Sequence, residues 1–363
     1  MIKKILQVIF GMIAGIYIGI SSFTFDAPIF VGVIIVFIIL FVAVFIHIII
    51  HELGHLIFGL LSGYHFVSFR ILSFQLTKTK DGYKFHRYSL AGTGGQCLLE
   101  PPNEVGEKYP YKLYLIGGII FNFFFALVAM LINIYVDSNE ISLFLSIFFF
   151  VGLFLGLSNL IPIKEPIQND GYNFFKMSEE DERYLWVQFK IYALQIRGVK
   201  LSDMNEEFFK YVEPVGSSFE ASVGLAAINR AESIKDFDEV ERIATDILDA
   251  NNNVMLLIKN LTKVSLLYKR IICEEDIELL YEETESIRKR MSLNPSIIRC
   301  EYAYHLLISD NDEVAKAKRQ LFFKIFRSYP DKTTILYEKD LIILAEQKKT
   351  IKNHWQIAYN LII

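Results

Sequence analysis

Cysteine is scarce in this chain of 363 residues, which contains only three. Cys97, Cys273 and Cys300 are widely separated and form no close-spaced pair. An odd number without close spacing argues against a disulfide framework and against a zinc site built from cysteine. The chain also lacks an excess of basic residues, with 37 Lys and Arg against 41 Asp and Glu, so its charge does not suggest a nucleic-acid partner.

Charged residues are almost absent from four long segments, which carry most of the apolar side chains instead. These segments cover roughly residues 5–22, 29–62, 113–136 and 141–162. Each is long enough to cross about 30 Å of hydrocarbon as a helix. With 53% hydrophobic residues, the chain is too apolar for an ordinary soluble protein. We therefore expect an all-α membrane protein with about four transmembrane helices, in contact with the lipid bilayer.

The first apolar segment has two interpretations. Lys3 and Lys4 followed by an apolar run are typical of a cleaved signal peptide. The run continues to Ile20, however, and 21–25 is a poor match to the small-residue pattern of a cleavage site. We favour a retained helix.

The placement of lysine and arginine predicts the orientation of the helices. Basic residues precede the first segment and are frequent in the connection 63–112, whereas 21–28 and 137–140 contain none. Because basic residues concentrate on the cytoplasmic side of membrane proteins, both termini and the 63–112 connection should be cytoplasmic. The sequence thus predicts a multi-pass protein of the cell membrane.

The second apolar segment contains His51-Glu52-Leu53-Gly54-His55. On a helix, this spacing places two imidazoles on one face, where they can bind zinc while Glu52 acts as a general base. Three ionisable groups within about one helical turn are costly at membrane depth and indicate function. His47 lies one turn earlier on the same face. We interpret it as a packing residue or a hydrogen-bond partner, because a fourth protein ligand would close the metal site.

The His-Glu-x-x-His motif is typical of zinc proteases. Such a protease needs a third protein ligand for zinc, with the fourth coordination position left for water. The best candidate is Asp170, which follows the fourth apolar segment after Pro162 and Pro166. The prolines prevent a regular helix there, and Gly171 permits close approach. Two alternatives remain open: Asp170 caps the next helix, or Glu165 is the ligand instead.

In three places the chain resembles the site-2 protease family of intramembrane zinc metalloproteases. The motif at 51–55 is similar to the family's metal motif, and 159–171 is similar to its Asn-x-x-Pro followed by Asp-Gly. Gly118-Ile119-Ile120-Phe121-Asn122 resembles its Gly-Pro-x-x-Asn, with Ile119 in the place of proline. The resemblance covers residues 30–171.

The resemblance implies an intramembrane zinc metalloprotease that hydrolyses peptide bonds of membrane-spanning protein or peptide substrates. Such enzymes act in regulated intramembrane proteolysis or in processing peptide precursors. The resemblance further implies Zn²⁺ bound by His51, His55 and Asp170, with Glu52 as the catalytic base and Asn122 facing the substrate carbonyl.

Two other function classes are open to a membrane protein of this kind. One is a catalytically degenerate adaptor that binds partners through its C-terminal part. The intact motif argues against it, because an adaptor does not need Glu52. The other is a metal-dependent transporter, for which four spans without an internal repeat are a poor starting point.

The connection 63–112 has a β pattern. Residues 66–76 are rich in β-forming side chains, and Asp81-Gly82 marks a hairpin turn before 83–88. We expect a cytoplasmic β-hairpin insertion. Its edge either holds an extended substrate by strand addition or has no such role.

From about residue 172, charged residues become frequent and amphipathic helical spacing replaces continuous hydrophobicity. We therefore divide the chain into a transmembrane zinc protease domain, 1–171, and a soluble cytoplasmic helical domain, 172–363. The helices expected in the second domain cover 185–196, 219–231, 237–248, 255–268, 275–288, 297–309 and 313–328. Tetratricopeptide-like stacked hairpins are one arrangement that fits this pattern. The absence of a catalytic constellation there favours a regulatory role or a protein partner.

Overall fold

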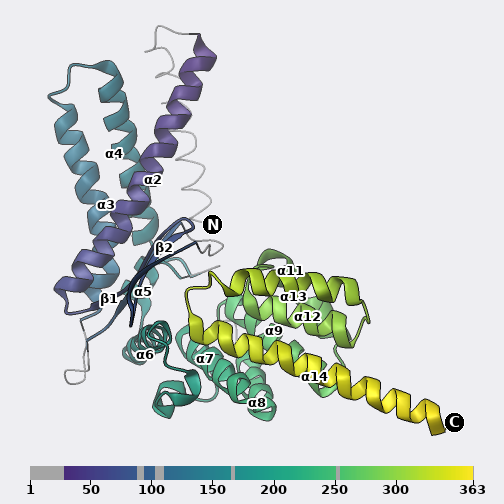
Figure 1. The fold of residues 1–363 in the computed structure, drawn as a ribbon. Helices are drawn as coiled ribbons and strands as arrows, with labels where there is room; N and C mark the ends of the chain where they lie inside the picture. Colours follow the sequence, from purple (N-terminus) through teal and green to yellow (C-terminus); the bar gives the residue numbers. More distant parts are fainter. Residues whose placement is uncertain (1–27, 88–93, 103–109, 165–167, 251–253, 363) are drawn as a thin grey trace. The chain divides into compact units, whose positions relative to one another are not determined.

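The computed structural model describes residues 28–87, 94–102, 110–164, 168–250 and 254–362 (Figure 1). The expected membrane helix at 5–22 lies outside the described residues, and so does Glu165. Contacts along the chain define two compact units. Of the described residues, the first unit comprises 28–71, 94–102, 110–164 and 168–177, and the second comprises 72–87, 178–250 and 254–362.

Three helices of the first unit are long and apolar enough to span a membrane (Figure 1). They are α2 (Ile29–Leu61), α3 (Lys112–Asn133) and α4 (Asn139–Leu160). Their ends lie within three residues of the segments expected from the sequence. Helix α2 has 33 residues and is therefore about 50 Å long, which exceeds the ~30 Å thickness of the hydrocarbon layer. These helices are those of a multi-pass membrane protein.

Glycines let α2 and α3 approach each other closely. A Cβ atom at Gly54 would lie 2.3 Å from the carbonyl oxygen of Gly117, and one at Gly117 would lie 2.5 Å from that of Gly54. Membrane helices commonly pack through small residues, because no hydrophobic force drives them together within lipid. This contact lies within the metal-binding motif, so it brings the first half of α3 against the two histidines.

Polar side chains stabilise the start of α4, and one hydrogen bond joins α4 to α3, with which it forms an antiparallel pair. Ser138 caps α4, since its Oγ accepts the N–H of Ile141 at 3.4 Å. Glu140 lies in the first turn of α4, where the helix dipole favours a negative charge. Asn133 near the end of α3 donates a hydrogen bond to Oγ of Ser146 in α4, at 3.2 Å. This bond gives the Asn133 amide nitrogen a partner within the helix pair.

Four strands form an antiparallel sheet in the order β3-β2-β1-β4. They are β1 (His65–Ile71), β2 (Phe74–Thr79), β3 (Gly82–Arg87) and β4 (Gly95–Glu100). In β1 and β4, Phe69 lies opposite Cys97. In β2 and β3, Thr79 pairs with Gly82, so the expected hairpin turn at Asp81-Gly82 is present. Strand β4 lies at one edge of the sheet.

The sheet is larger than the single hairpin that the sequence predicts. The β pattern over 66–76 predicts one strand, but the chain turns at Leu72, whose φ of 51° lies in the left-handed region, and two strands result. The sequence pattern does not predict β4, because a strand that begins at Gly94-Gly95 carries little β propensity. The fold is thus mostly helical with a four-stranded sheet, and the expectation of an all-α protein with one hairpin is corrected.

The second unit consists mainly of helices. They are α6 (Glu179–Ile196), α7 (Ser218–Ile234), α8 (Phe237–Asp249), α9 (Leu256–Cys273), α10 (Glu278–Glu283), α11 (Glu285–Arg290), α12 (Pro295–Leu307), α13 (Asp312–Phe326) and α14 (Lys332–Ile362), with two short 3-10 helices at Leu201–Asp203 and Glu206–Phe209. Capping boxes begin two of them, at Ser178 with Asp181 and at Ser217 with Glu220. The β2–β3 hairpin belongs to this unit, where Gln75 donates to the hydroxyl of Tyr192 at 3.5 Å.

Helix α14 is the longest helix of this unit, and the sequence pattern does not predict it. Over residues 332–354 its buried side chains are Thr333, Ile335, Glu338, Leu341, Ile342 and Ala345. A glutamate within this stripe interrupts the apolar periodicity that identifies a helix in the sequence. Its burial depends on a partner of opposite charge.

That partner is Arg299 of α12, which is completely buried. The Arg299 guanidinium contacts a carboxylate of Glu338 at 3.1 Å and one of Glu232 in α7 at 3.0 Å. The ring of Tyr268 in α9 lies 4.1 Å from the same guanidinium. Four helices therefore meet around one buried charge cluster, and removal of a single partner would leave an uncompensated charge in the core.

Candidate metal centre

Helix α2 holds His51 and His55 one turn apart on the same face. Their Nε2 atoms lie 3.1 Å from each other, and the two rings meet edge to face. Both side chains are largely buried, with 13% of His51 and 9% of His55 exposed. Two nitrogen atoms at this separation can bind one metal ion.

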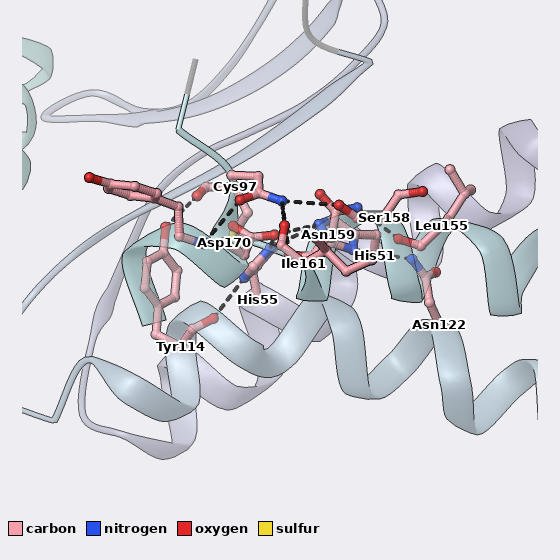
Figure 2. Close-up of polar contacts among 12 residues, drawn as sticks. His51, His55, Cys97, Tyr114, Asn122, Leu155, Ser158, Asn159, Ile161 and Asp170 are labelled. Carbon is pink, nitrogen blue, oxygen red and sulfur yellow. Dashed lines mark hydrogen bonds and ion pairs between the residues drawn. The ribbon is translucent and has the colours of Figure 1, made fainter. Parts of the chain in front are cut away.

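Asp170 approaches the histidines from the start of α5 (Asp170–Lys176), as Figure 2 shows. Its Oδ2 atom lies 3.1 Å from Nε2 of His51 and 3.4 Å from Nε2 of His55. Nitrogen and oxygen atoms bound to tetrahedral zinc at about 2.0–2.2 Å lie about 3.4 Å from one another. The three residues therefore fit a zinc ion and leave it a fourth coordination position. The structure thus brings together the three ligands expected from the sequence.

Asn169 holds the chain that connects α4 to Asp170. Its Oδ1 atom accepts the N–H groups of Tyr172 at 3.0 Å and Ile163 at 2.9 Å, and the first of these bonds caps α5. Its Nδ2 atom faces three carbonyl oxygens at the end of α4, those of Ser158 (3.0 Å), Asn159 (3.1 Å) and Ile161 (2.8 Å). One amide thereby ties the beginning of α5 to the end of α4 and positions the neighbouring carboxylate.

Two glycines leave room for the ligands. A Cβ atom at Gly118 in α3 would lie 2.6 Å from the ring of His51 and 2.7 Å from Nε2 of His55. A Cβ atom at Gly171 would lie 2.1 Å from the carbonyl oxygen of Leu160. Real Cβ atoms do not approach other atoms so closely. Any larger residue at Gly118 would therefore displace the imidazoles, and one at Gly171 would displace Asp170.

Glu52, the general base expected from the sequence, is only 8% exposed. Strand β4 passes next to it, because a Cβ atom at Gly95 would lie 2.6 Å from both Cγ and Oε1 of Glu52. The absence of a side chain at Gly95 thus lets the backbone of an edge strand contact the carboxylate. This contact places the start of β4 beside the metal ligands.

The second ring nitrogen of His55 has a hydrogen-bond partner. Its Nδ1–H donates to the main-chain carbonyl of Tyr114 in α3, at 2.7 Å. A neutral imidazole carries one proton, so a proton on Nδ1 leaves Nε2 free to bind a metal. The Tyr114 hydroxyl in turn donates to the carbonyl of Cys97 in β4, at 2.7 Å. The sequence contains no signal for this partner, because the group that accepts is a main-chain oxygen.

Asn122 of α3 lies beside His51 and is 1% exposed. Its side-chain amide spans two histidines, with Nδ2 3.2 Å from Nδ1 of His51 and Oδ1 3.2 Å from Nδ1 of His47. His47 is completely buried, and its Nε2 atom lies 3.0 Å from the carbonyl oxygen of Phe148 in α4. His47 thus lies among hydrogen-bond partners, as the sequence suggests. The contact between Asn122 and a substrate carbonyl, which the family resemblance implies, stays a prediction.

Cys97 is the cysteine closest in sequence to the residues of the site, and it lies buried in β4. Burial raises the pKa of the Cys97 thiol well above its usual range. The thiol therefore stays protonated at neutral pH, and a protonated thiol is a poor metal ligand and a poor nucleophile.

The fold and the site define a class of protein: a multi-pass membrane protein whose apolar helices hold a cluster of two histidines and one aspartate that could bind a metal ion. Residues 39–138 match the family model of peptidase family M50, the site-2 protease family. This match confirms, over residues 39–138, the resemblance to that family seen in the sequence. The match includes the motif at 51–55 and Asn122, and it ends before Asp170. No curated protein and no solved structure matches the chain.

Proposed function

We propose that this protein is a zinc-dependent intramembrane protease that hydrolyses peptide bonds of membrane-embedded substrates. The observation that carries this proposal is the convergence of His51, His55 and Asp170, whose donor atoms lie 3.1–3.4 Å apart beside the buried Glu52. The match to peptidase family M50 supports it, because that family comprises metallopeptidases.

Each residue of the site has a role in this proposal. His51, His55 and Asp170 hold the zinc ion, which supplies a Lewis acid for water and for the scissile carbonyl. Glu52 accepts the proton of the attacking water and passes it to the leaving amine. Burial of Glu52 against Gly95 excludes bulk water from the carboxylate and so limits competing proton exchange.

The edge strand β4 is the proposed binding site for an extended substrate. A helix hides its carbonyl groups in hydrogen bonds, so a transmembrane substrate must unwind before it can be cleaved. Strand β4 lies last in the order β3-β2-β1-β4, and its first residue contacts Glu52. A substrate strand added to this edge would receive main-chain hydrogen bonds and pass close to the general base.

We propose that the enzyme is a multi-pass protein of the cell membrane with both termini in the cytoplasm. The distribution of basic residues in the sequence supports this orientation. His51 and His55 would then lie toward the cytoplasmic end of α2, and water would reach the site from that side. Residues 1–171 would form the protease domain, and the helical domain at 172–363 would bind a protein partner or regulate the protease.

The test of this proposal is the substitution Glu52→Gln in the purified full-length protein. We expect zinc content to stay unchanged and peptide hydrolysis to be lost, because glutamine preserves the shape of the side chain but cannot accept the proton. Hydrolysis is measured by mass spectrometry on a set of single-span membrane peptides. Glu140→Gln is the matched control, since this exposed carboxylate lies at the opposite end of the helices, in the first turn of α4. Continued cleavage by the Glu52 variant would contradict the assigned role.

A further inference from the structure

A chain of buried polar contacts leads from His51 away from the metal site. It runs from Nδ1 of His51 to the amide of Asn122, from that amide to Nδ1 of His47, and from Nε2 of His47 to the carbonyl of Phe148. The three distances are 3.2, 3.2 and 3.0 Å. His47 and Asn122 are 0% and 1% exposed, so solvent does not compete for these bonds.

The chemistry of the groups restricts where the protons lie. The Phe148 carbonyl can only accept, so Nε2 of His47 carries a proton. With a neutral ring, Nδ1 of His47 then has a lone pair and requires an N–H group from the Asn122 amide. The amide oxygen consequently faces His51. Because this oxygen can only accept a hydrogen bond, Nδ1 of His51 must carry the proton. A 180° rotation of the amide about its last side-chain bond exchanges its two ends and produces this arrangement in the same space.

We propose that Asn122 and His47 are positioning residues that hold His51 in the tautomer required for metal binding. With its proton on Nδ1, His51 presents an unprotonated Nε2 atom to the ion, beside Nε2 of His55 and Oδ2 of Asp170. The opposite tautomer would place a proton on Nε2 and block the metal. This inference rests on the proposed function, since it assumes that the site binds zinc.

The packing around His47 shows that its ring has a defined place. A Cβ atom at Gly152 in α4 would lie 2.3 Å from Cε1 of His47, so this glycine makes the space that the ring occupies. The ring of Phe148 lies 4.1 Å from the His47 ring, centroid to centroid. An imidazole held on two sides by α4 can orient an amide on α3. We call the chain of contacts from His51 through Asn122 and His47 to Phe148 the relay; it passes through the three helices α2, α3 and α4. It also gives the polar ring of His47 hydrogen-bond partners among apolar helices.

The relay assigns Asn122 a role different from contact with a substrate. The proposed chain of hydrogen bonds uses the amide oxygen and one of the two amide N–H groups, so only the second N–H would remain for a substrate carbonyl. The two roles have different experimental signatures. Loss of the relay weakens zinc binding, whereas loss of a substrate contact changes KM or kcat and leaves zinc affinity unchanged.

The test measures zinc affinity of the full-length protein in detergent, by competition with a chromophoric chelator. Asn122→Leu removes both hydrogen bonds at similar volume and should weaken zinc binding about 10–100-fold, as is usual for partners of a metal-bound histidine. Asn122→Asp should weaken zinc binding less than Asn122→Leu, because a carboxylate oxygen still accepts a hydrogen bond from Nδ1–H of His51, although it cannot supply the N–H that Nδ1 of His47 requires. His47→Leu should weaken binding less than Asn122→Leu, since the amide remains but is no longer oriented.

The controls separate the relay from the metal site and from general packing. Asn133→Leu removes another interhelical amide bond from the same helix and should leave zinc affinity unchanged. His51→Ala should abolish tight binding. Equal affinities in Asn122→Leu and Asn133→Leu, with loss in His51→Ala, would overturn the relay alone; a raised KM in Asn122→Leu would then assign the residue to the substrate. A wild-type protein that binds no zinc would overturn the proposed function and the relay together.

Discussion

The substitution Gly118→Ala tests whether the position of the imidazoles limits the activity. The added Cβ atom would lie 2.6 Å from the ring of His51 and 2.7 Å from Nε2 of His55, whereas ordinary contacts begin at 3.4 Å. The shortfall of about 0.7–0.8 Å must be taken up by the imidazoles or by a shift of α3 against α2. The shift of the helix is costly, because Gly54 and Gly117 already bring the two backbones into contact.

Displacement of catalytic groups by about 1 Å can reduce rates about 100-fold. We therefore expect kcat/KM of Gly118→Ala to fall about 10–100-fold, with zinc affinity reduced as well. The matched control is Gly156→Ala in α4, whose Cβ atom would lie 2.7 Å from the ring of Phe123 and not from a metal ligand. Chelator competition and peptide hydrolysis are measured on both purified variants. If the two variants were indistinguishable in both assays, the reasoning from ligand position would be refuted.

Two further predictions concern the third ligand and the helical unit. Asp170→Ala should lower zinc content and hydrolysis together, whereas Glu165→Ala should change neither; metal analysis of both variants checks this, and the opposite pattern would transfer the ligand role to Glu165. In the helical unit, burial raises the pKa of Glu338 to about 7 from an ordinary value of 4.5, so the native state keeps a proton that the unfolded chain releases between these values. The contribution of Glu338 to the free energy of unfolding should therefore be greatest below pH 4.5 and should be lost as the pH rises through 7, a decrease on the order of 3 kcal/mol. Urea unfolding followed by the fluorescence of Trp186, which lies in α6, reports on this unit. An unaltered pH dependence in Glu338→Gln would contradict the prediction.

The membrane helices and the histidine pair could be predicted from the sequence because each depends on local information. Continuous apolar runs identify α2, α3 and α4 to within three residues at either end. The spacing of His51 and His55 translates directly into a shared helix face. Features of this kind can be predicted from the sequence because the residues that determine them lie close together along the chain.

Other features depend on contacts between distant segments and leave weak signals. Asp170 reaches the site because Asn169 bonds to carbonyl groups of α4, and a sequence pattern does not show main-chain acceptors. Strand β4 begins with glycines that would weaken an isolated strand, yet Gly95 is required by its contact with Glu52. Helix α14 has a glutamate in its buried stripe, Glu338, whose carboxylate contacts Arg299 from another helix.

The two histidines of the site are held in different ways, and this difference determines which substitutions can alter metal affinity. The partner of His55 is the main-chain carbonyl of Tyr114, so no single side-chain replacement at that position removes the hydrogen bond. The partner of His51 is the side chain of Asn122, which in turn depends on His47. If the site binds zinc as proposed, substitutions at Asn122 and His47 should therefore change the zinc affinity in steps while His51, His55 and Asp170 are all retained. Substitutions at Tyr114 should instead act on the packing of α3 against β4, since its hydroxyl bonds to a carbonyl of that strand.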